Sequence, residues 1–538
     1  MFRRDLLKLS PLALASAAAG HIALAQTPEP SATEALYNVR RYGATGDGKT
    51  VDTPAINRAI EAVAAAGGGT LLFPAGTYLC FTIRLRSNVD LFLSPGCTIL
   101  AADSPRPGEA TGYNGGVYDP AGPAQPWEEY QDYGHNHWPN SLFYGEGIRD
   151  FAITGPGLIH GKGLSYGQGG HRGDYTNFTA EQPGVGNKAI ALKNCRNVLL
   201  RDFSILKGGH FGILATGVDN ITIDNLVIDT DRDGMDIDCC RNVRVSNCTV
   251  NSPWDDGICP KSSYALGYNR ATENVTITNC YVTGTYELGT VLDGTFKKFA
   301  PDARVPRTGR IKCGTESNGG FRNIAISNCV FEHSRGFALE SVDGALCEDI
   351  SFVGVTMRGT LNAPLFMRLG ARMRGPKDRK VGTLKRILIS NVTSYDAFQL
   401  PSILSGVPGF PIEDVKISDV YLHQVGGGDA AMAALEPEER EKAYPEPTMF
   451  GAMQATGFFL RHVRNLEMSN IEIATEQPDA RAAFALKDVE GADFFRVRVP
   501  RSSPAPVFAL EAVSEFRVFG SQFVADKSVA KVESKATF

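Results

Sequence analysis

The sequence predicts an all-β fold, a single-stranded right-handed parallel β-helix with an N-terminal capping helix and long loop insertions. Three observations support this prediction: one short phrase recurs along the chain, its aliphatic positions alternate, and an amphipathic helix precedes the first copies. The 538 residues are 43% hydrophobic and 21% charged, so the chain has enough apolar side chains to fill a large core.

The recurring phrase consists of Asn or Asp, an aliphatic residue, any residue, an aliphatic residue, a small polar residue, Asn or Asp, and an aliphatic residue or Cys. Clear copies begin at Asn220, Asn242, Asn274, Asn323, Asp414 and Asn465. Weaker copies begin at Asn197, Asp349 and Arg386. The basic period is 22 to 28 residues, and longer intervals indicate inserted loops or a degenerate coil.

Each copy predicts a short β-strand, because its aliphatic residues alternate and turn residues bound it. One period has room for three such strands, and the next coil supplies parallel partners about 4.8 Å away. The second Asn of each copy falls at a bend, where Asn tolerates a left-handed backbone and stacks on its equivalents. These positions are Asn225, Asn247, Asn279, Asn328, Asn391 and Asn470.

Two segments have a helical pattern. The first segment lies between residues 52–54 and Gly67 and predicts a short helix, with Asp52 as its cap. We expect this helix to cover the open core of the first coil. Residues 426–444 contain the second, which we expect to interrupt the coils as a projecting loop. Because no Pro-, Ser- or charge-rich linker divides the chain, residues 26–538 are predicted to form one β-helix domain.

Residues 1–25 have a basic start, an apolar middle and a small-residue exit, and they predict an export signal cut near Gln26. Arg3 and Arg4, followed by two leucines, resemble a twin-arginine signal, and an ordinary secretory leader is the alternative. We therefore expect an exported bacterial protein, periplasmic or secreted. No later apolar run approaches about twenty residues, so no membrane span is expected.

The formal net charge of −5 argues against a protein that coats a polyanion, so we expect no nucleic-acid partner. The eleven cysteines are an odd number for a secreted chain. Cys248, Cys280 and Cys329 recur at one place in the phrase, which favours a buried rung position over a disulfide framework. Cys239 and Cys240 lack the spacing of a zinc site. The sequence assigns neither disulfide pairing nor oligomeric state.

Six aspartates cluster on two neighbouring coils. Asp233 and the pair Asp255 and Asp256 are one period of 22 residues apart, so we expect their carboxylates on adjacent rungs of one face. Cleavage of a glycosidic bond needs an acid for the leaving oxygen and a carboxylate that activates water, about 6.5 to 9.5 Å apart in inverting enzymes. Crowding of three carboxylates raises the pKa of at least one of them. For Asp231, Asp236 and Asp238, solvated turn residues are an equal alternative.

Arg310 and Lys312 are two residues apart, so on a strand both side chains point to the same face. We expect them to clamp the carboxylate of an acidic sugar, because arginine offers a bidentate fork and lysine a point charge. Arg368, Arg372 and Arg374 form a second basic group. It either forms a solvated basic turn, which is the preferred interpretation, or extends the recognition of an anionic sugar. A calcium ion held by the aspartates is the alternative to a metal-free site, and it would support elimination from a uronate.

The chain resembles glycoside hydrolase family 28, the polygalacturonase family. The resemblance rests on residues 37–60, on Asp-Gly-Met-Asp at 233–236, on Asp-Asp-Gly-Ile-Cys at 255–259 and on Arg-Ile-Lys at 310–312. It covers residues 37–345, and the coil repeats extend it to about residue 470. It implies a right-handed β-helix and hydrolysis by single displacement with inversion. It also implies that Asp255 is the general acid, that Asp233 and Asp256 hold and activate water, and that Arg310 and Lys312 bind the uronate carboxylate.

Two features stand out against the family pattern. The family carries a Gly-His-Gly about one coil after the aspartate pair, but this chain has no histidine there and Gly284 lies near its place. Tyr286 or Glu287 would replace that histidine, or both are structural. The long aromatic loop 112–138 either binds sugars or packs as a satellite core, and it can also block one end of a groove. Its candidate sugar ligands are Trp127, Tyr130, Tyr133, His135, His137 and Trp138.

We therefore predict a glycoside hydrolase that cleaves uronic-acid-containing, pectin-type poly- or oligosaccharides with inversion and without a metal or other cofactor. Polygalacturonase, exo-galacturonidase and rhamnogalacturonan-related activities all fit the residues, and a mode that trims chain ends is preferred. The alternatives are a polysaccharide lyase on the same fold, which would depend on calcium, and a non-catalytic carbohydrate-binding β-helix.

Overall fold

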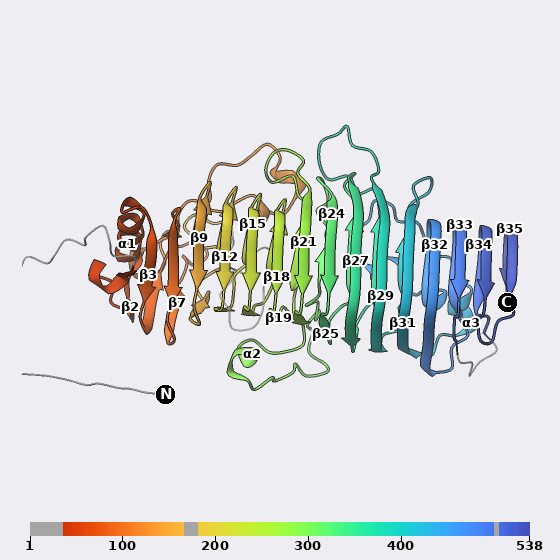
Figure 1. Cartoon of the computed structure of the whole chain (residues 1–538). Coiled ribbons are helices and arrows are strands. Elements are labelled where there is room, and N and C mark those ends of the chain that lie inside the picture. Colours follow the sequence, from red (N-terminus) through yellow and green to blue (C-terminus); the bar gives the residue numbers. More distant parts are fainter. Residues whose placement is uncertain (1–35, 166–180, 500–504) are drawn as a thin grey trace, which may run out of the picture. The chain divides into compact units, whose positions relative to one another are not determined.

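Consecutive coils of the chain stack directly on one another (Figure 1). The computed structural model describes residues 36–165, 181–499 and 505–538, so the predicted export signal lies outside the described residues. Within these ranges all pairings of named strands but one are parallel, and they join each strand to its equivalent in the next coil. Val243, for example, pairs with Ile221 before it and with Val275 after it. The predicted parallel β-helix with inserted loops is confirmed.

Each regular coil contributes one strand to each of three columns. The first column contains β3 (Gly69–Phe73), β6 (Val89–Leu93), β9 (Arg149–Thr154), β12 (Arg196–Arg201), β15 (Asp219–Asp224), β18 (Arg241–Ser246), β21 (Thr272–Thr278) and β24 (Phe321–Ser327). The second contains β4 (Gly76–Cys80), β7 (Cys97–Ala101), β10 (Leu158–His160), β13 (Ser204–Leu206), β16 (Val227–Asp229), β19 (Thr249–Asn251), β22 (Tyr281–Thr283) and β25 (Val330–Glu332). The third contains β5 (Ile83–Arg84), β8 (Ser141–Glu146), β11 (Lys188–Lys193), β14 (Phe211–Thr216), β17 (Asp233–Asp238), β20 (Ile258–Lys261), β23 (Lys312–Cys313), β26 (Phe337–Ser341), β28 (Leu365–Leu369) and β30 (Ser402–Ser405).

The first and last coils depart from this scheme. The chain begins with β1 (Leu36–Asn38) and β2 (Asp47–Val51), which pair with β3 and β4. In the later coils one long strand passes through more than one column, as in β27 (Leu346–Arg358), β29 (Thr383–Ala397), β31 (Ile412–Gly426), β32 (Ala455–Gln477), β33 (Ala482–Phe495) and β34 (Phe508–Phe519). The last strand, β35 (Lys527–Thr537), pairs antiparallel with β34 and ends the stack.

A helix covers the first coil, as predicted. α1 (Thr53–Ala65) buries Ile56 and Ile60 completely and packs on β3 and β5. The prediction that Asp52 caps this helix is wrong, because its side chain makes no capping hydrogen bond. The Asp52 carboxylate instead accepts from the backbone N–H of Thr45 at 2.7 Å, so it fixes the turn before β2.

Asparagines hold the bends between columns in a left-handed backbone. All six predicted positions have φ between 54° and 57°, which confirms the prediction. The first Asn of the phrase is left-handed as well, with φ of 56° at Asn197 and 58° at Asn220. The Nδ2 of Asn220 donates to Oδ1 of Asn197 at 2.8 Å, so equivalent side chains also bond from coil to coil.

The aliphatic positions of the phrase fill the interior of the coils. Equivalent positions in four coils are at most 1% exposed, namely Ile221, Val243, Val275 and Ile324. All eleven cysteines are buried and free, which agrees with a rung position rather than a disulfide framework. In the described ranges no helix has the length and apolar character that a membrane crossing requires.

The remaining helices are short and lie in the connections between strands. They are η1 (Val39–Tyr42), η2 (Tyr113–Gly115), η3 (Glu128–Tyr130), η4 (Tyr133–His135), α2 (Thr290–Asp293), α3 (Ala430–Ala433) and η5 (Pro447–Phe450). Within residues 426–444, where we predicted a helix, the structure has only the single turn α3. Asp429 caps that turn by accepting from the N–H of Met432 at 2.8 Å, and Pro437 interrupts the helical pattern soon after it.

Replacement of Asn225 by Ala is expected to lower the thermal stability of the protein. The change removes the amide that donates to Oδ1 of Asp202 at 2.9 Å and leaves an ordinary side chain at φ 55°. A left-handed backbone costs such a residue about 1 to 2 kcal/mol. Thermal unfolding followed by circular dichroism measures the loss, and Asn225→Gly, which tolerates this backbone, should lose less. Equal losses in the two variants would contradict this explanation.

Candidate active site

Asp233, Asp255 and Asp256 meet on one face of the β-helix. Asp233 begins β17 and the pair lies in the turn before β20, so the parallel pairing of these strands brings them together. One carboxylate oxygen from each lies within 4.8 Å of the others. The convergence predicted from the spacing is therefore present.

Two buried cations hold Asp256. Arg310 Nε donates to Oδ1 of Asp256 at 2.8 Å, and Lys312 Nζ pairs with Oδ2. Burial raises the pKa of Asp256, but Lys312 and Arg310 together outweigh burial and hold that pKa well below its usual value. In this structure the carboxylate that Arg310 and Lys312 clamp is that of Asp256. The role of both cations toward a substrate stays a prediction.

Asp255 is the most exposed of the three carboxylates, with 28% of its side chain accessible. The Nη2 of Arg232 donates to Oδ2 of Asp255 at 2.8 Å. Our sequence analysis missed Arg232, whose only signal is its place directly before Asp233. From that place its side chain reaches across to the aspartate pair on the next coil.

The pKa of Asp233 is raised, whereas that of Asp256 is lowered. Its side chain is buried, and burial, together with the charges of Asp255 and Asp236, raises its pKa well above the usual value. Lys261, whose Nζ lies 4.0 Å from Oδ1 of Asp233, opposes this rise without cancelling it. Crowding thus raises the pKa of at least one carboxylate, as expected, and keeps a proton in the cluster.

The interpretation of Asp231, Asp236 and Asp238 as solvated turn residues is wrong, because all three are at most 1% exposed. Asp238 accepts from the N–H of Ser263 at 2.8 Å and supports the coil. Asp236 lies 3.4 Å from Lys261 Nζ. Burial raises the pKa of Asp236 to about 7, although Lys261 lowers it.

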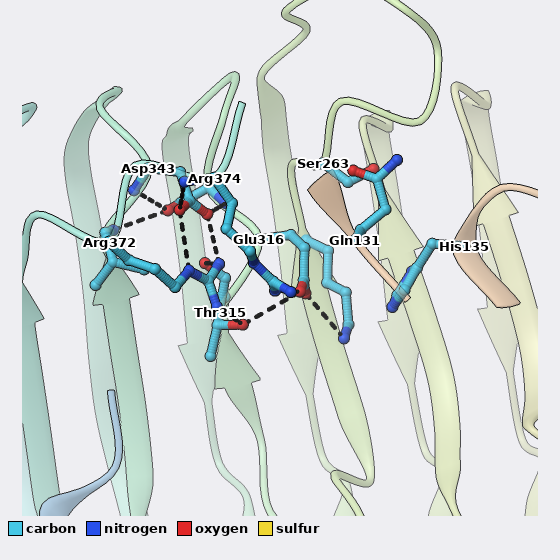
Figure 2. A network of polar contacts seen from close by, with 12 residues as sticks. Gln131, His135, Ser263, Thr315, Glu316, Asp343, Arg372 and Arg374 are labelled. Atoms are coloured by element: carbon cyan, nitrogen blue, oxygen red, sulfur yellow. Dashed lines mark hydrogen bonds and ion pairs between the residues drawn. The ribbon is translucent and has the colours of Figure 1, made fainter. Parts of the chain in front are cut away.

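An ion network continues from Lys261 across the following coils (Figure 2). Glu316 accepts from Lys261 at 3.3 Å and from Nη2 of Arg374 at 2.6 Å, so one buried carboxylate serves two cations. All three arginines of the second basic group are bonded within the protein, namely Arg368, Arg372 and Arg374. The interpretation as a solvated basic turn is wrong for Arg368 and Arg372, whose side chains are at most 8% exposed, whereas the Arg374 side chain is 31% exposed.

A cavity of about 230 Å³ lies over the carboxylates. Its lining consists of Asp132, His135, His210, Phe211, Arg232, Asp233, Asp255, Lys261, Lys312, Thr315, Glu316, Arg374 and Tyr444. The inserted segments 102–140, 370–382 and 427–454 contribute to this lining together with the third column of strands. Burial lowers the pKa of His135 and of His210 well below the usual value, which favours neutral imidazoles at the cavity wall.

The aromatic loop 112–138 packs on the β-helix through two tryptophans and brings one histidine to the cavity. Trp127 Nε1 donates to the carbonyl of Ala265 at 3.1 Å, and Trp138 Nε1 donates to Thr216 Oγ1 at 3.1 Å. These tryptophans hold the loop against the β-helix, so they are packing residues. His135, by contrast, reaches the cavity from the same loop.

Neither Tyr286 nor Glu287 takes the place of the missing family histidine. Tyr286 donates to a glutamate at 2.9 Å and Glu287 pairs with a lysine at 2.7 Å, and neither lines the cavity. A Cβ at Gly284 would lie 2.5 Å from the backbone of a neighbouring loop, so this position accommodates no side chain. In this structure the side chain that contacts Asp255 is Arg232.

The 427–454 segment lies along the active-site side, which differs from the projecting loop that we predicted. Glu446 accepts from Nη2 of Arg310 at 2.9 Å and pairs with Nη1 of Arg335 at 3.2 Å. Tyr444 lines the cavity and is 56% exposed. The segment therefore fixes Arg310 from the side opposite Asp256 and adds an aromatic ring to the cavity wall.

The three aspartates satisfy the distance requirement of a metal site, which was the alternative for this cluster. Their charges do not fit that alternative. Arg310 and Lys312 neutralise Asp256, and Arg232 neutralises Asp255. Calcium needs several oxygen ligands whose charge is available to it, and three adjacent cations repel it.

Several known proteins are similar to this chain in sequence or in fold. The family model described as rhamnogalacturonase A/epimerase, pectate lyase-like, matches residues 36–286. A probable polygalacturonase from Vitis vinifera is 23% identical over 401 residues, which are 71% of this chain and 73% of that relative.

Two solved structures are similar to this chain in fold, each at 18% sequence identity. An exopolygalacturonase from Thermotoga maritima has a TM-score of 0.59 and covers 83% of this chain and 93% of its own. A family 28 exopolygalacturonase from Yersinia enterocolitica has a TM-score of 0.56 and covers 91% and 79%. These findings confirm the right-handed β-helix and the resemblance to glycoside hydrolase family 28.

The raised pKa of Asp236 predicts a pH-dependent loss of stability. Because this pKa is about 7 in the folded protein against a usual value of 3.8, the folded state retains a proton that the unfolded chain releases. The stability of the wild type should therefore fall, relative to Asp236→Asn, as the pH rises from about 4 to about 7. Thermal midpoints of both proteins across this range measure the effect. Asp302→Asn, at an exposed loop position, is the control, and a pH-independent difference for Asp236→Asn would contradict the prediction.

Proposed function

We propose that this chain, which resembles glycoside hydrolase family 28, hydrolyses glycosidic bonds in uronic-acid-containing polysaccharides or oligosaccharides of the pectin type. The observation that carries the proposal is the meeting of Asp233, Asp255 and Asp256 on one face, beside Arg310 and Lys312. The similarity of 71% of the chain to a probable polygalacturonase supports a pectic substrate. The pattern of residues 1–25 supports export to the periplasm or the medium.

Asp255 is proposed as the general acid. It is the most exposed of the three carboxylates and it lines the cavity, so it can reach the glycosidic oxygen of a bound sugar. Arg232 orients it through a single hydrogen bond. The raised pKa of the neighbouring Asp233, which burial and the charges of Asp255 and Asp236 cause, favours a proton in this cluster.

Asp256 and Asp233 are proposed to hold and activate the water. Asp256 is the stronger candidate for the base, because Lys312 and Arg310 keep it ionised. In the proposed step the water oxygen bonds to the anomeric carbon and gives its proton to the carboxylate, while the bond to the leaving oxygen breaks and Asp255 protonates that oxygen. This single displacement inverts the anomeric centre.

A chain-end mode is proposed for the cleavage. The cavity is about 230 Å³, and the insertions 102–140, 370–382 and 427–454 all reach its wall. A small site enclosed by three insertions favours a terminal sugar over the middle of a long chain. The similarity in fold to two exopolygalacturonases agrees with this mode.

Asp255→Asn should lower kcat on oligogalacturonides by at least about a hundredfold, because the amide has no proton to give to the leaving group. KM should change little, since the variant keeps the shape of the site. Initial rates of reducing-end release measure both constants. Asp302→Asn is the matched control outside the site, and a wild-type rate in Asp255→Asn would remove the acid role from this residue.

Product analysis separates the proposed reaction from its alternatives. Proton NMR of the first products should show the inverted anomer of a single terminal uronate, and a ladder of internal fragments would refute the chain-end mode. A lyase would give ultraviolet-absorbing unsaturated products and would stop when a chelator removes calcium. We expect neither, because the cations around the aspartates disfavour a calcium ion. A binding module would release no product at all.

A further inference from the structure

We infer that Arg374, in the 370–382 insertion, binds the carboxylate of the uronate that occupies the cavity. This inference rests on the proposed function, because it names the group that reads the charge of that substrate. It differs from the assignment that the family resemblance implies, in which Arg310 and Lys312 bind the uronate. Three features of the cavity lead to it.

The first feature is that Arg310 is fully engaged within the protein. Its Nε donates to Asp256 at 2.8 Å and its Nη2 donates to Glu446 at 2.9 Å, so carboxylates occupy both sides of the guanidinium. Its side chain is 2% exposed and it is absent from the lining of the cavity. A substrate carboxylate would have to displace one of these buried partners, and breaking a buried ion pair is strongly unfavourable.

The second feature is that Arg374 still has donors available. The side chain is 31% exposed and lines the cavity. Its Nη2 donates to Glu316 at 2.6 Å, and among the described residues its buried Nε has no hydrogen-bond partner. A buried donor without an acceptor is unfavourable, so an entering carboxylate that accepted from this guanidinium would remove the penalty.

The third feature is the local charge. Glu316 accepts from both Arg374 and Lys261 (Figure 2), and Lys261 also lies 3.4 Å from Asp236. Arg374 therefore shares its one carboxylate partner with a second cation. The backbone N–H of Arg374 donates to Asp343 at 3.0 Å, and Asp343 also accepts from Arg372, so the insertion is anchored and holds Arg374 at the cavity wall.

The test compares an acidic sugar with its neutral analogue. D-galacturonate and D-galactose share a ring and differ at the carboxylate, and calorimetric or NMR titration measures the binding of each. Arg374→Gln should weaken galacturonate binding by about tenfold to a hundredfold and leave galactose binding unchanged. Lys377→Gln removes a charge from an exposed position of the same insertion and should change neither affinity.

Kinetics give a second readout. Arg374→Gln should raise KM for oligogalacturonides by a similar factor and lower kcat much less, because the contact already exists in the bound ground state. If Arg374→Gln does not fold, Arg374→Lys decides the question. It keeps the charge opposite Glu316 and loses the planar fork, so galacturonate should bind more weakly and galactose as before.

Two results would overturn the inference: wild-type affinity for galacturonate in the folded variant, or equal losses for both sugars, which indicate a general distortion of the site. Failure of the inference is separable from failure of the proposed function. If the wild type cleaves pectic oligosaccharides and Arg374→Gln binds galacturonate normally, only the inference fails. If the wild type neither binds galacturonate nor cleaves such oligosaccharides, the proposed function fails as well.

Discussion

The parallel hydrogen bonding between successive coils is the constraint on which the rest of this structure depends. It forces equivalent residues of neighbouring coils to stack, and left-handed asparagines such as Asn225 keep the bends in register. The same register that buries Val243 under Val275 also sets Asp233 beside the turn that carries Asp255. Stability and site geometry therefore come from one repeating interaction.

Charge compensation then gives the three clustered carboxylates different properties. Asp256 contacts two cations and stays ionised, Asp255 contacts one arginine at the edge of the cavity, and Asp233 is buried near like charges and favours its protonated form. Identical side chains thus acquire distinct chemistry from burial and from neighbours. In the proposed reaction the ionised Asp256 suits the role of the base, and the same cations disfavour a divalent metal ion.

The inserted segments form part of the wall of the cavity at these carboxylates. Segments 102–140, 370–382 and 427–454 leave the coils at different points and return to one cavity. Each contributes a different group, namely a neutral imidazole, a guanidinium and an aromatic ring. In the proposed reaction the β-helix therefore supplies the reacting groups, and its insertions supply the remaining wall of the cavity.

The sequence by itself determined the period, the inward face, the bends and the convergence of the three aspartates, because a parallel β-helix converts a fixed spacing into stacking. Local patterns do not determine which charges pair. Arg310 and Glu446 are 136 residues apart, and only the folded chain shows that this contact and Asp256 engage the guanidinium. The same limit applies to Asp236, for which the residue pattern did not decide between a site residue and a solvated turn residue, and whose pKa burial raises to about 7. Such properties depend on distance and on exclusion of water, and both exist only in the tertiary structure.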